Sequence, residues 1–195
     1  DLHLFPYTTL FRSGYVFQQS KNDLDSAISA YQSAYLLTPE DIDIYVNLGS
    51  AFYDKEDIDN ALIVYRNALE LNPQNAQIHC NLGFLHWGKG NLDEAIKEYN
   101  YAIEYDPNYD IAYNNLGVIY LDDLGRVAKS IDLFKKSIEC NPNYALAYFN
   151  LARAITVTGD KIEAAKLYQT AQDINKITNE IEPEDIVEKI NDLFE

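Results

Sequence analysis

Four stretches of the chain repeat one pattern: DIYVNLGSAFY (Asp43–Tyr53), QIHCNLGFLHW (Gln77–Trp87), IAYNNLGVIYL (Ile111–Leu121) and LAYFNLARAIT (Leu146–Thr156). A proline precedes each stretch, and these prolines recur every 34 or 35 residues, at Pro39, Pro73, Pro107 and Pro142. An alanine and a tyrosine follow most of the stretches, as at Ala61 and Tyr65. The 195 residues therefore read as tandem units and not as one globular domain.

The spacing within a unit predicts a pair of helices. We number each unit so that its proline is position 32. Positions 4, 7, 8 and 11 then fall on one side of a helix that turns by about 100° per residue. Glycine at position 8 and alanine at position 20 remove bulk where two helices approach, and aromatic side chains fill the space beside them. One pair cannot bury its aromatic face alone, so we expect the pairs to stack.

These residues resemble the tetratricopeptide repeat (TPR) family over roughly Gly14 to Lys176. The family pattern is met in the first full unit by Tyr45, Leu48, Gly49, Phe52, Ala61, Tyr65, Ala68 and Pro73. The third unit departs from it with Ser130, Phe134 and Ser137, and with one extra residue within Asp122–Gly125. The fourth unit has Lys176 where proline is expected. The resemblance implies an all-α fold, a right-handed α-solenoid of antiparallel helix pairs (a TPR superhelix).

The units have the following expected boundaries: a partial first repeat at 14–39, full repeats at 42–75, 76–109, 110–144 and 145–178, and a C-terminal capping helix at 183–194. The last of these repeats has a degenerate end. The capping helix carries an apolar stripe of Ile186, Val187, Ile190, Leu193 and Phe194. Asp57, Asn91 and Asp160 stand where second helices should begin and can cap them. The pairs Asn72-Pro73 and Asn141-Pro142 should end helices.

Residues 1–13 match neither the composition nor the pattern of the remainder. Leu4–Ser13 equals the translation of a string found in a common short-read sequencing adapter, so we expect a non-native leader and a native sequence that begins near Gly14. Gly14–Lys21 would then be the second half of a helix whose start is missing. The chain contains no methionine, which also favours a fragment or a processed product.

The composition excludes several classes of function. Fifteen basic against 31 acidic residues leave a formal charge of −16, which disfavours nucleic acid and anionic membranes as partners. The apolar runs are too short to span a bilayer. His79 and His86 lie about 10 Å apart along a helix, too far to share one ion with Cys80. With no phosphate loop, nucleophile elbow or metal-ligand cluster in the sequence, we expect no cofactor, no metal site and no enzymatic activity.

The candidate site is the face opposite the packing stripe, which in this family lines a concave groove. Position 6 is asparagine in every full repeat, at Asn47, Asn81, Asn115 and Asn150. Asparagine has poor helix propensity, but its amide pairs with a peptide backbone as donor and acceptor. We predict that this exposed ladder tracks an extended peptide. The alternative is that each asparagine bonds its own neighbours or water.

Further groove positions should set specificity. They comprise Asp43, Ser50, Tyr53, Asp54, Gln77, Phe84, Trp87, Asn114, Val118, Phe149 and Arg153. Arg153 alone is basic, which disfavours the clamp by which some family members hold acidic C-termini. Phe84 and Trp87 are the expected anchors, although packing against a neighbouring repeat explains Trp87 equally well.

The sequence therefore predicts a non-catalytic scaffold that binds an extended apolar or basic peptide segment of another protein. One alternative is the TPR arm of a larger enzyme, such as a protein glycosyltransferase. Another is self-association through the exposed first repeat. We expect a cytoplasmic location, with a signal peptide left open because the true N-terminus is expected to be missing.

Overall fold

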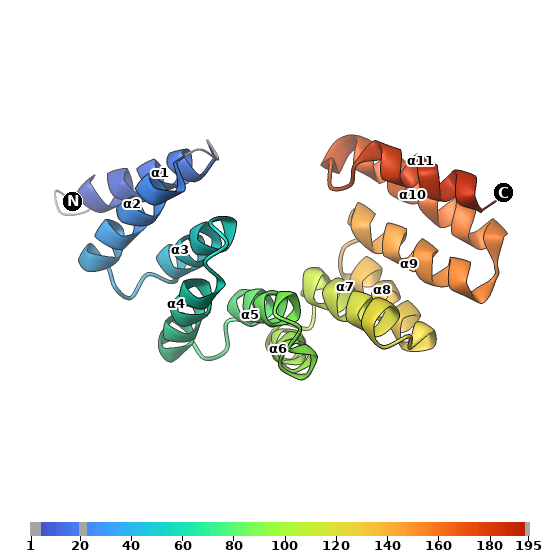
Figure 1. The fold of residues 1–195 in the computed structure, drawn as a ribbon, viewed down its shortest axis with the longest axis horizontal. Helices are drawn as coiled ribbons and strands as arrows, with labels where there is room; N and C mark the ends of the chain where they lie inside the picture. Colours follow the sequence, from blue (N-terminus) through green and yellow to red (C-terminus); the bar gives the residue numbers. More distant parts are fainter. Residues whose placement is uncertain (1–4, 20–22, 194–195) are drawn as a thin grey trace. The chain divides into compact units, whose positions relative to one another are not determined.

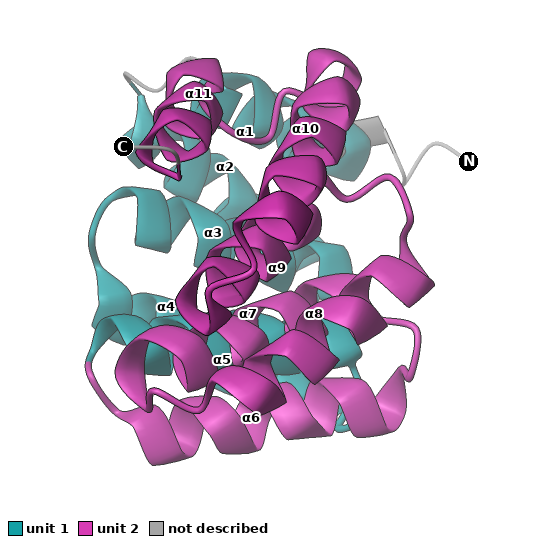
Figure 2. Ribbon diagram, turned by 90° about the vertical axis from the view of Figure 1, so that its right-hand side faces the viewer, with its two compact units in different colours: residues 1–89 teal, residues 90–195 magenta. Residues whose placement is uncertain are grey.

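The computed structural model describes residues 5–19 and 23–193, and within these ranges every regular element is a helix. The all-α class expected from the sequence is therefore confirmed. The chain divides into two compact units, residues 1–89 and residues 90–195, coloured teal and magenta in Figure 2.

Unit 1 contains five helices: α1 (Phe5–Gln19), α2 (Leu24–Leu37), α3 (Ile42–Asp54), α4 (Ile58–Leu71) and α5 (Ala76–Gly88). Each helix packs against the next one along the chain, and α1 also contacts α3 (Figure 1). The first helices α1 and α3 are thus neighbours, and α3 meets α5 through the rings of Tyr53 and Phe84.

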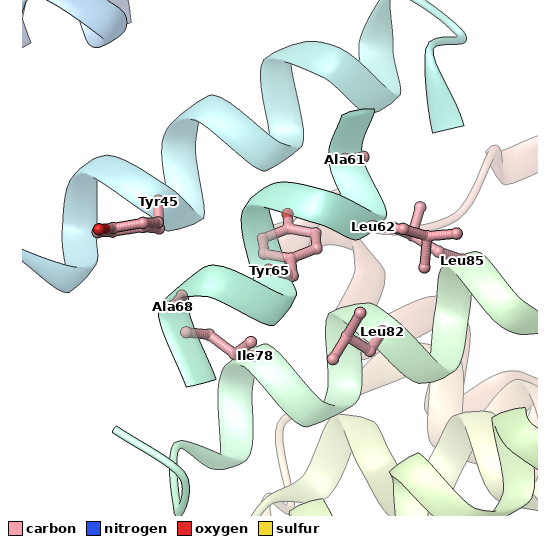
Figure 3. Close-up of a cluster of buried hydrophobic side chains, with 8 residues drawn as sticks. All are labelled: Tyr45, Ala61, Leu62, Tyr65, Ala68, Ile78, Leu82 and Leu85. Atoms are coloured by element: carbon pink, nitrogen blue, oxygen red, sulfur yellow. The ribbon is translucent and has the colours of Figure 1, made fainter. Parts of the chain in front are cut away.

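The core of unit 1 forms where α4 packs between α3 and α5. Eight residues make up this cluster, drawn in Figure 3: Tyr45, Ala61, Leu62, Tyr65, Ala68, Ile78, Leu82 and Leu85. The ring of Tyr65 is 3% exposed and lies directly on Gly49 of α3. A methyl group at Gly49 would come within 2.5 Å of that ring, so glycine is required there for the helices to approach.

The same contact recurs in two other repeats. The rings of Tyr31 and Phe134 lie on Gly14 and Gly117, where an added Cβ would be 2.6 Å from the ring in each case. The fourth repeat has the buried Ala152 at this position, so its pair of helices accommodates one methyl group. The small residue and the aromatic ring thus act as one packing unit that sets the distance between paired helices.

Unit 2 contains α6 (Leu92–Tyr105), α7 (Asp110–Val118), the π-helix η1 (Ile119–Asp123), α8 (Val127–Cys140), α9 (Ala145–Thr158), α10 (Lys161–Thr178) and α11 (Pro183–Asp192). Consecutive helices again pack against one another, and α7 contacts α9. Ser130 and Ser137 replace the usual alanines and are fully buried. Their hydroxyls donate to the carbonyl oxygens of Val127 (2.8 Å) and Asp110 (2.9 Å), so both of these buried hydroxyls have a hydrogen-bond partner.

The extra residue of the third repeat is absorbed by η1. The backbone N–H of Leu124 donates to the carbonyl oxygen of Ile119, and that of Arg126 donates to Tyr120. These wider turns take up one residue without breaking the helix, as single π-turns do elsewhere. The widened turns span Ile119–Asp123 and so overlap the expected range of Asp122–Gly125.

The helix ends largely follow the sequence predictions. Asp57 and Asp160 are N-caps that accept from the backbone N–H of Asn60 and Glu163. Asn91 occupies the N-cap of α6 but makes no side-chain capping bond. Asn72 and Asn141 are the C-caps before their prolines, as expected.

The missing proline at Lys176 lets α10 run on to 18 residues. Asn175, which is 5% exposed, then holds the turn that follows. Its Oδ1 accepts from the N–H groups of Glu180 and Ile181, and its Nδ2 donates to the Ile181 carbonyl. In α11, Ile186 is buried as expected, but Val187 is 44% exposed and so lies outside the buried stripe. Phe194 lies outside the described residues.

Helix α1 crosses the expected boundary at Gly14. Residues 5–13 form its first half, and Phe11 packs on Tyr31 with ring centroids 5.8 Å apart. The hydroxyl of Tyr7 donates to the carboxylate of Asp41. The chain therefore has a full-length first helix where the sequence predicts only a second half, whereas the non-native origin of residues 1–13 stays a prediction. Residues 1–4 and 20–22 lie outside the described ranges.

We predict that Gly49→Ala lowers the free energy of unfolding by about 1–3 kcal/mol, because the new methyl group overlaps the closely packed Tyr65 ring. Gly88→Ala is the matched control, since a Cβ there meets nothing within 4 Å. That variant should be neutral or more stable by up to about 1 kcal/mol. Urea unfolding followed by circular dichroism measures both, and equal effects would contradict the proposed close contact.

Candidate functional site

Three adjoining hollows run along α1, α3 and α5 of unit 1. Their volumes are about 520, 540 and 250 Å³. Five residues each line two of the three hollows: Ser50, Tyr53, Asp54, Phe84 and Leu85. We call this surface the unit-1 groove. Its complete lining is Gln18, Gln19, Leu24, Val46, Ser50, Tyr53, Asp54, Glu56, Ile58, Tyr65, Gln77, Asn81, Phe84, Leu85 and Gly88.

Six of the expected site residues line this groove: Ser50, Tyr53, Asp54, Gln77, Asn81 and Phe84. Asp43 and Asn47 lie on α3 outside the three hollows. The amide of Asn47 donates to the Asp43 carbonyl of its own helix at 2.7 Å. For Asn47 the structure therefore agrees with the alternative that the asparagine bonds a neighbour on its own helix.

Aromatic side chains form the apolar part of the groove. Tyr53 of α3 and Phe84 of α5 meet edge to face, with ring centroids 5.2 Å apart, and they remain 40% and 38% exposed. Trp87 is half-buried beside Phe84, at a centroid distance of 6.5 Å. Exposed rings held rigidly by a scaffold are the typical anchors of protein interfaces.

The structure adds residues that the sequence analysis did not select. Gln18 donates from Nε2 to Ser50 Oγ (3.1 Å) and to Asp54 Oδ2 (2.9 Å). It also accepts from the Tyr31 hydroxyl. Gln18 stands four residues after Gly14, as Tyr53 does after Gly49, so counting the groove positions of the partial repeat would have found it.

Asn81 is half-buried and belongs to both the groove and the core. It forms a hydrogen bond with the hydroxyl of Tyr65, which also lies 3.4 Å from the Val46 carbonyl oxygen. Burial raises the pKa of Tyr65 well above its usual value, and the hydrogen bond from Asn81 opposes that rise. Tyr65 therefore stays neutral at physiological pH, and its hydroxyl is a buried polar group in the lining of the groove.

In unit 2 the expected site residues form a hydrogen-bonded network. Asn150 Nδ2 donates to Asn114 Oδ1 at 2.9 Å, and Arg153 Nη1 donates to Asn150 Oδ1 at 3.2 Å. Arg153 Nη2 donates to both carboxylate oxygens of Asp122, at 2.9 and 3.0 Å. Asn114 and Asn150 are 1% and 4% exposed. The expected exposure of the asparagine ladder is therefore wrong for Asn150.

Other unit-2 residues are also taken up by packing. Val118 lies against the cluster around Phe134, Leu151 and Ala154, and Phe149 packs edge to face on Tyr168. Asn115 accepts a hydrogen bond from Asn114. The predicted exposure fails because helical periodicity gives the direction of a side chain around its own helix only. It takes no account of the first helix of the neighbouring repeat. Here α7 and α9 are in contact, and Asn114 and Asn150 become buried between them.

The histidines and cysteines of the described chain have structural positions. His79 Nε2 lies 3.0 Å from the Pro73 carbonyl oxygen, and the Tyr45 hydroxyl makes the equivalent bond to Pro39 in the preceding repeat. Cys80 is buried, and both cysteines are free thiols. Within the described ranges, no three His, Cys, Asp or Glu side chains are arranged to hold a metal ion. No described helix has the length and apolar character needed to cross a membrane.

We predict that Asn150→Ala lowers the free energy of unfolding by about 1–3 kcal/mol, because the buried Oδ1 of Asn114 loses its donor and Nη1 of Arg153 loses its acceptor. Asn47→Ala is the matched control at the same repeat position. It removes only a bond to its own helix and gains helix propensity, so its effect should stay within about 0.5 kcal/mol. Thermal and urea unfolding measure both, and similar losses for the two would refute the assigned network.

Comparison with known proteins gives two kinds of result. A protein-family model described as "TPR repeat" matches residues 20–55, 49–90 and 88–123. Two models described as "Tetratricopeptide repeat" match residues 111–144 and 133–172. No curated protein matches the chain.

Several solved structures are similar. MamA is 25% identical with a TM-score of 0.66, over 91% of this chain and 96% of that chain. Yeast Tom70 is 18% identical with a TM-score of 0.80, over 95% of this chain and 39% of that chain. YrrB is 20% identical with a TM-score of 0.59, over 86% of each chain. Since the repeat matches together span most of the sequence, the chain belongs to the tetratricopeptide repeat family.

Proposed function

We propose that the protein is a non-catalytic interaction module whose unit-1 groove binds an extended, non-acidic peptide segment of another protein. The observation that carries this proposal is the pair of exposed rings, Tyr53 and Phe84, in a continuous series of hollows along α1, α3 and α5. Protein-interaction scaffolding is the general role of TPR arrays, and the relevant surface is formed by their first helices.

Polar groups between the rings suit a peptide backbone. Ser50, Gln77 and Asn81 line the same hollow as Tyr53 and Phe84. Their hydroxyl and amide groups both donate and accept hydrogen bonds, as the alternating N–H and C=O groups of an extended chain require. Of the four asparagines at position 6, Asn81 and Asn115 remain candidates for pairing with a peptide backbone. Asn47 bonds its own helix, and Asn150 is buried in the unit-2 network.

The charge of the proposed site disfavours an acidic ligand. Asp54 and Glu56 line the unit-1 groove, and Asp43 is exposed on the same helix as Asp54. Arg153, the basic residue among the expected site positions, is neutralised by Asp122. A peptide with carboxylates would meet only repulsion here, whereas apolar and basic side chains are compatible with the surface.

A solved relative supports the same class of function. YrrB is described as a TPR protein with an unusual peptide-binding site, and its fold matches this chain over 86% of both chains. The cytoplasmic location expected from the sequence stays a prediction.

We predict that Phe84→Ala weakens peptide binding about tenfold, because truncation removes the ring that packs against both Tyr53 and Trp87. Peptides selected from a random display library against the whole chain serve as ligands. Trp87 is the single tryptophan, so its fluorescence reports binding next to the groove. Ile63→Ala is the control, because Ile63 is 52% exposed on α4 and does not line the groove. If the library yields no binding peptide, the proposed function is refuted.

Self-association is a second candidate, supported by the surface of the first helix pair. Tyr35, Leu36 and Leu37 end α2 with exposed fractions of 39%, 79% and 52%, and Val16 of α1 is 63% exposed. Consecutive exposed apolar residues favour contact with another protein surface, and a second copy of this chain is one such surface.

If this candidate holds, sedimentation equilibrium should give a mass that rises with protein concentration. Leu36→Glu should return the mass to that of the monomer, because it places a charge on the apolar surface while removing no buried contact. A monomeric mass at every concentration would exclude self-association.

A further inference from the structure

We propose that the hollow between Tyr53, Phe84 and the turn at Glu56 binds the cationic head of an arginine or lysine side chain of the bound peptide. This inference rests on the proposed function and makes it more specific, from a non-acidic segment to one with a basic residue at a defined place. We call this hollow the cation pocket. Its volume is about 540 Å³, and its lining is Tyr53, Asp54, Glu56, Ile58, Phe84, Leu85 and Gly88.

The pocket combines two features that recognise such a head. The exposed rings of Tyr53 and Phe84, held edge to face, offer aromatic surface on which a guanidinium or ammonium group can lie. The carboxylates of Asp54 and Glu56 belong to the same lining and supply two negative charges. Arginine suits this combination better than lysine, since its planar head both stacks on rings and bonds carboxylates.

The two carboxylates are not neutralised by the protein. Asp54 accepts a bond from Gln18, which carries no charge. Among the described residues, neither Asp54 nor Glu56 forms an ion pair. The nearby lysines of the two turns are engaged elsewhere, since Lys55 pairs with Asp25 and Lys89 with Asp59. The charge of the pocket is therefore available to a ligand.

Charge complementarity also disfavours an apolar or an acidic side chain as the occupant of the cation pocket. An apolar side chain would remove Asp54 and Glu56 partly from water without giving them a partner, which costs free energy. An acidic side chain would add a like charge to both. A basic side chain with an aliphatic stem fits both parts of the lining, because its methylene groups cover the rings and its head meets the carboxylates.

Glu56 provides an unusual way to test this pocket. Its φ angle is +63°, in the left-handed region, and the same turn of the other repeats has Gly90, Gly125 and Gly159 with positive φ angles. Glycine adopts this conformation without the strain that a side chain causes. Glu56→Gly should therefore make the protein more stable while removing one carboxylate from the pocket.

The experiment compares three end-blocked peptides made of alanine and leucine around one central residue. That residue is arginine, citrulline (its uncharged isostere) or glutamate. Binding to the whole chain is followed by Trp87 fluorescence and calorimetry. We expect the arginine peptide to bind about tenfold more tightly than the citrulline peptide, with a difference that shrinks as salt is added. The glutamate peptide should bind most weakly.

Three variants separate the pocket from general effects. Glu56→Gln keeps the turn and should largely abolish the preference for arginine over citrulline. Glu56→Gly should do the same while raising Tm by about 2–4 °C, so its loss of binding does not come from unfolding. Glu70→Gln removes an equal charge from the exposed surface of α4 and should leave the preference unchanged.

The outcomes distinguish the two proposals. Equal affinity of the unmodified chain for the arginine and citrulline peptides overturns the cation pocket but leaves the peptide-binding function standing. A preference that survives Glu56→Gln also overturns it. No binding of any of the three, together with an empty display selection, refutes both proposals.

Discussion

The close contact between an aromatic ring and a glycine is the constraint on which the helix pairs α1–α2, α3–α4 and α7–α8 depend. Tyr65 on Gly49, Tyr31 on Gly14 and Phe134 on Gly117 bring paired helices to a distance that no larger side chain permits. The contact works only because the glycine position lies on a buried helix face. It sets the angle and register of each pair, and hence which residues of α1, α3 and α5 reach the unit-1 groove.

Deviations from the repeat show how local chemistry preserves this packing. The extra residue of the third repeat is confined to η1, so Phe134 still lies on Gly117. Where proline is missing at Lys176, α10 lengthens, and the buried Asn175 satisfies the backbone of the following turn. Buried Ser130 and Ser137 each find a carbonyl acceptor. In each case a change in sequence is offset by hydrogen bonds to the backbone nearby in space.

Asn47 and Asn150, the first and last asparagines at position 6, show what helical periodicity alone does not predict. Asn47 and Asn150 occupy the same repeat position, yet one bonds its own helix and the other is 4% exposed between Asn114 and Arg153. Asn114 on the preceding first helix makes this difference, since the corresponding residue on the first helix before Asn47 is Phe11, which has no side-chain hydrogen-bonding group. Glu56 was missed for a related reason. Glu56 lies in a turn, where helical periodicity does not predict the direction of a side chain. It becomes a site residue because it lines the same hollow as Tyr53 and Phe84.

The sequence by itself determined the helix pairs, their caps at Asp57 and Asp160, and the face on which Ser50, Tyr53, Gln77 and Phe84 lie. These follow from spacing along one helix and from backbone bonds at its ends, which are local properties. Only the tertiary structure decided which of the facing residues stay accessible. That depends on the neighbouring first helix, which leaves Tyr53 and Phe84 exposed in unit 1 and buries Asn114 and Asn150 in unit 2.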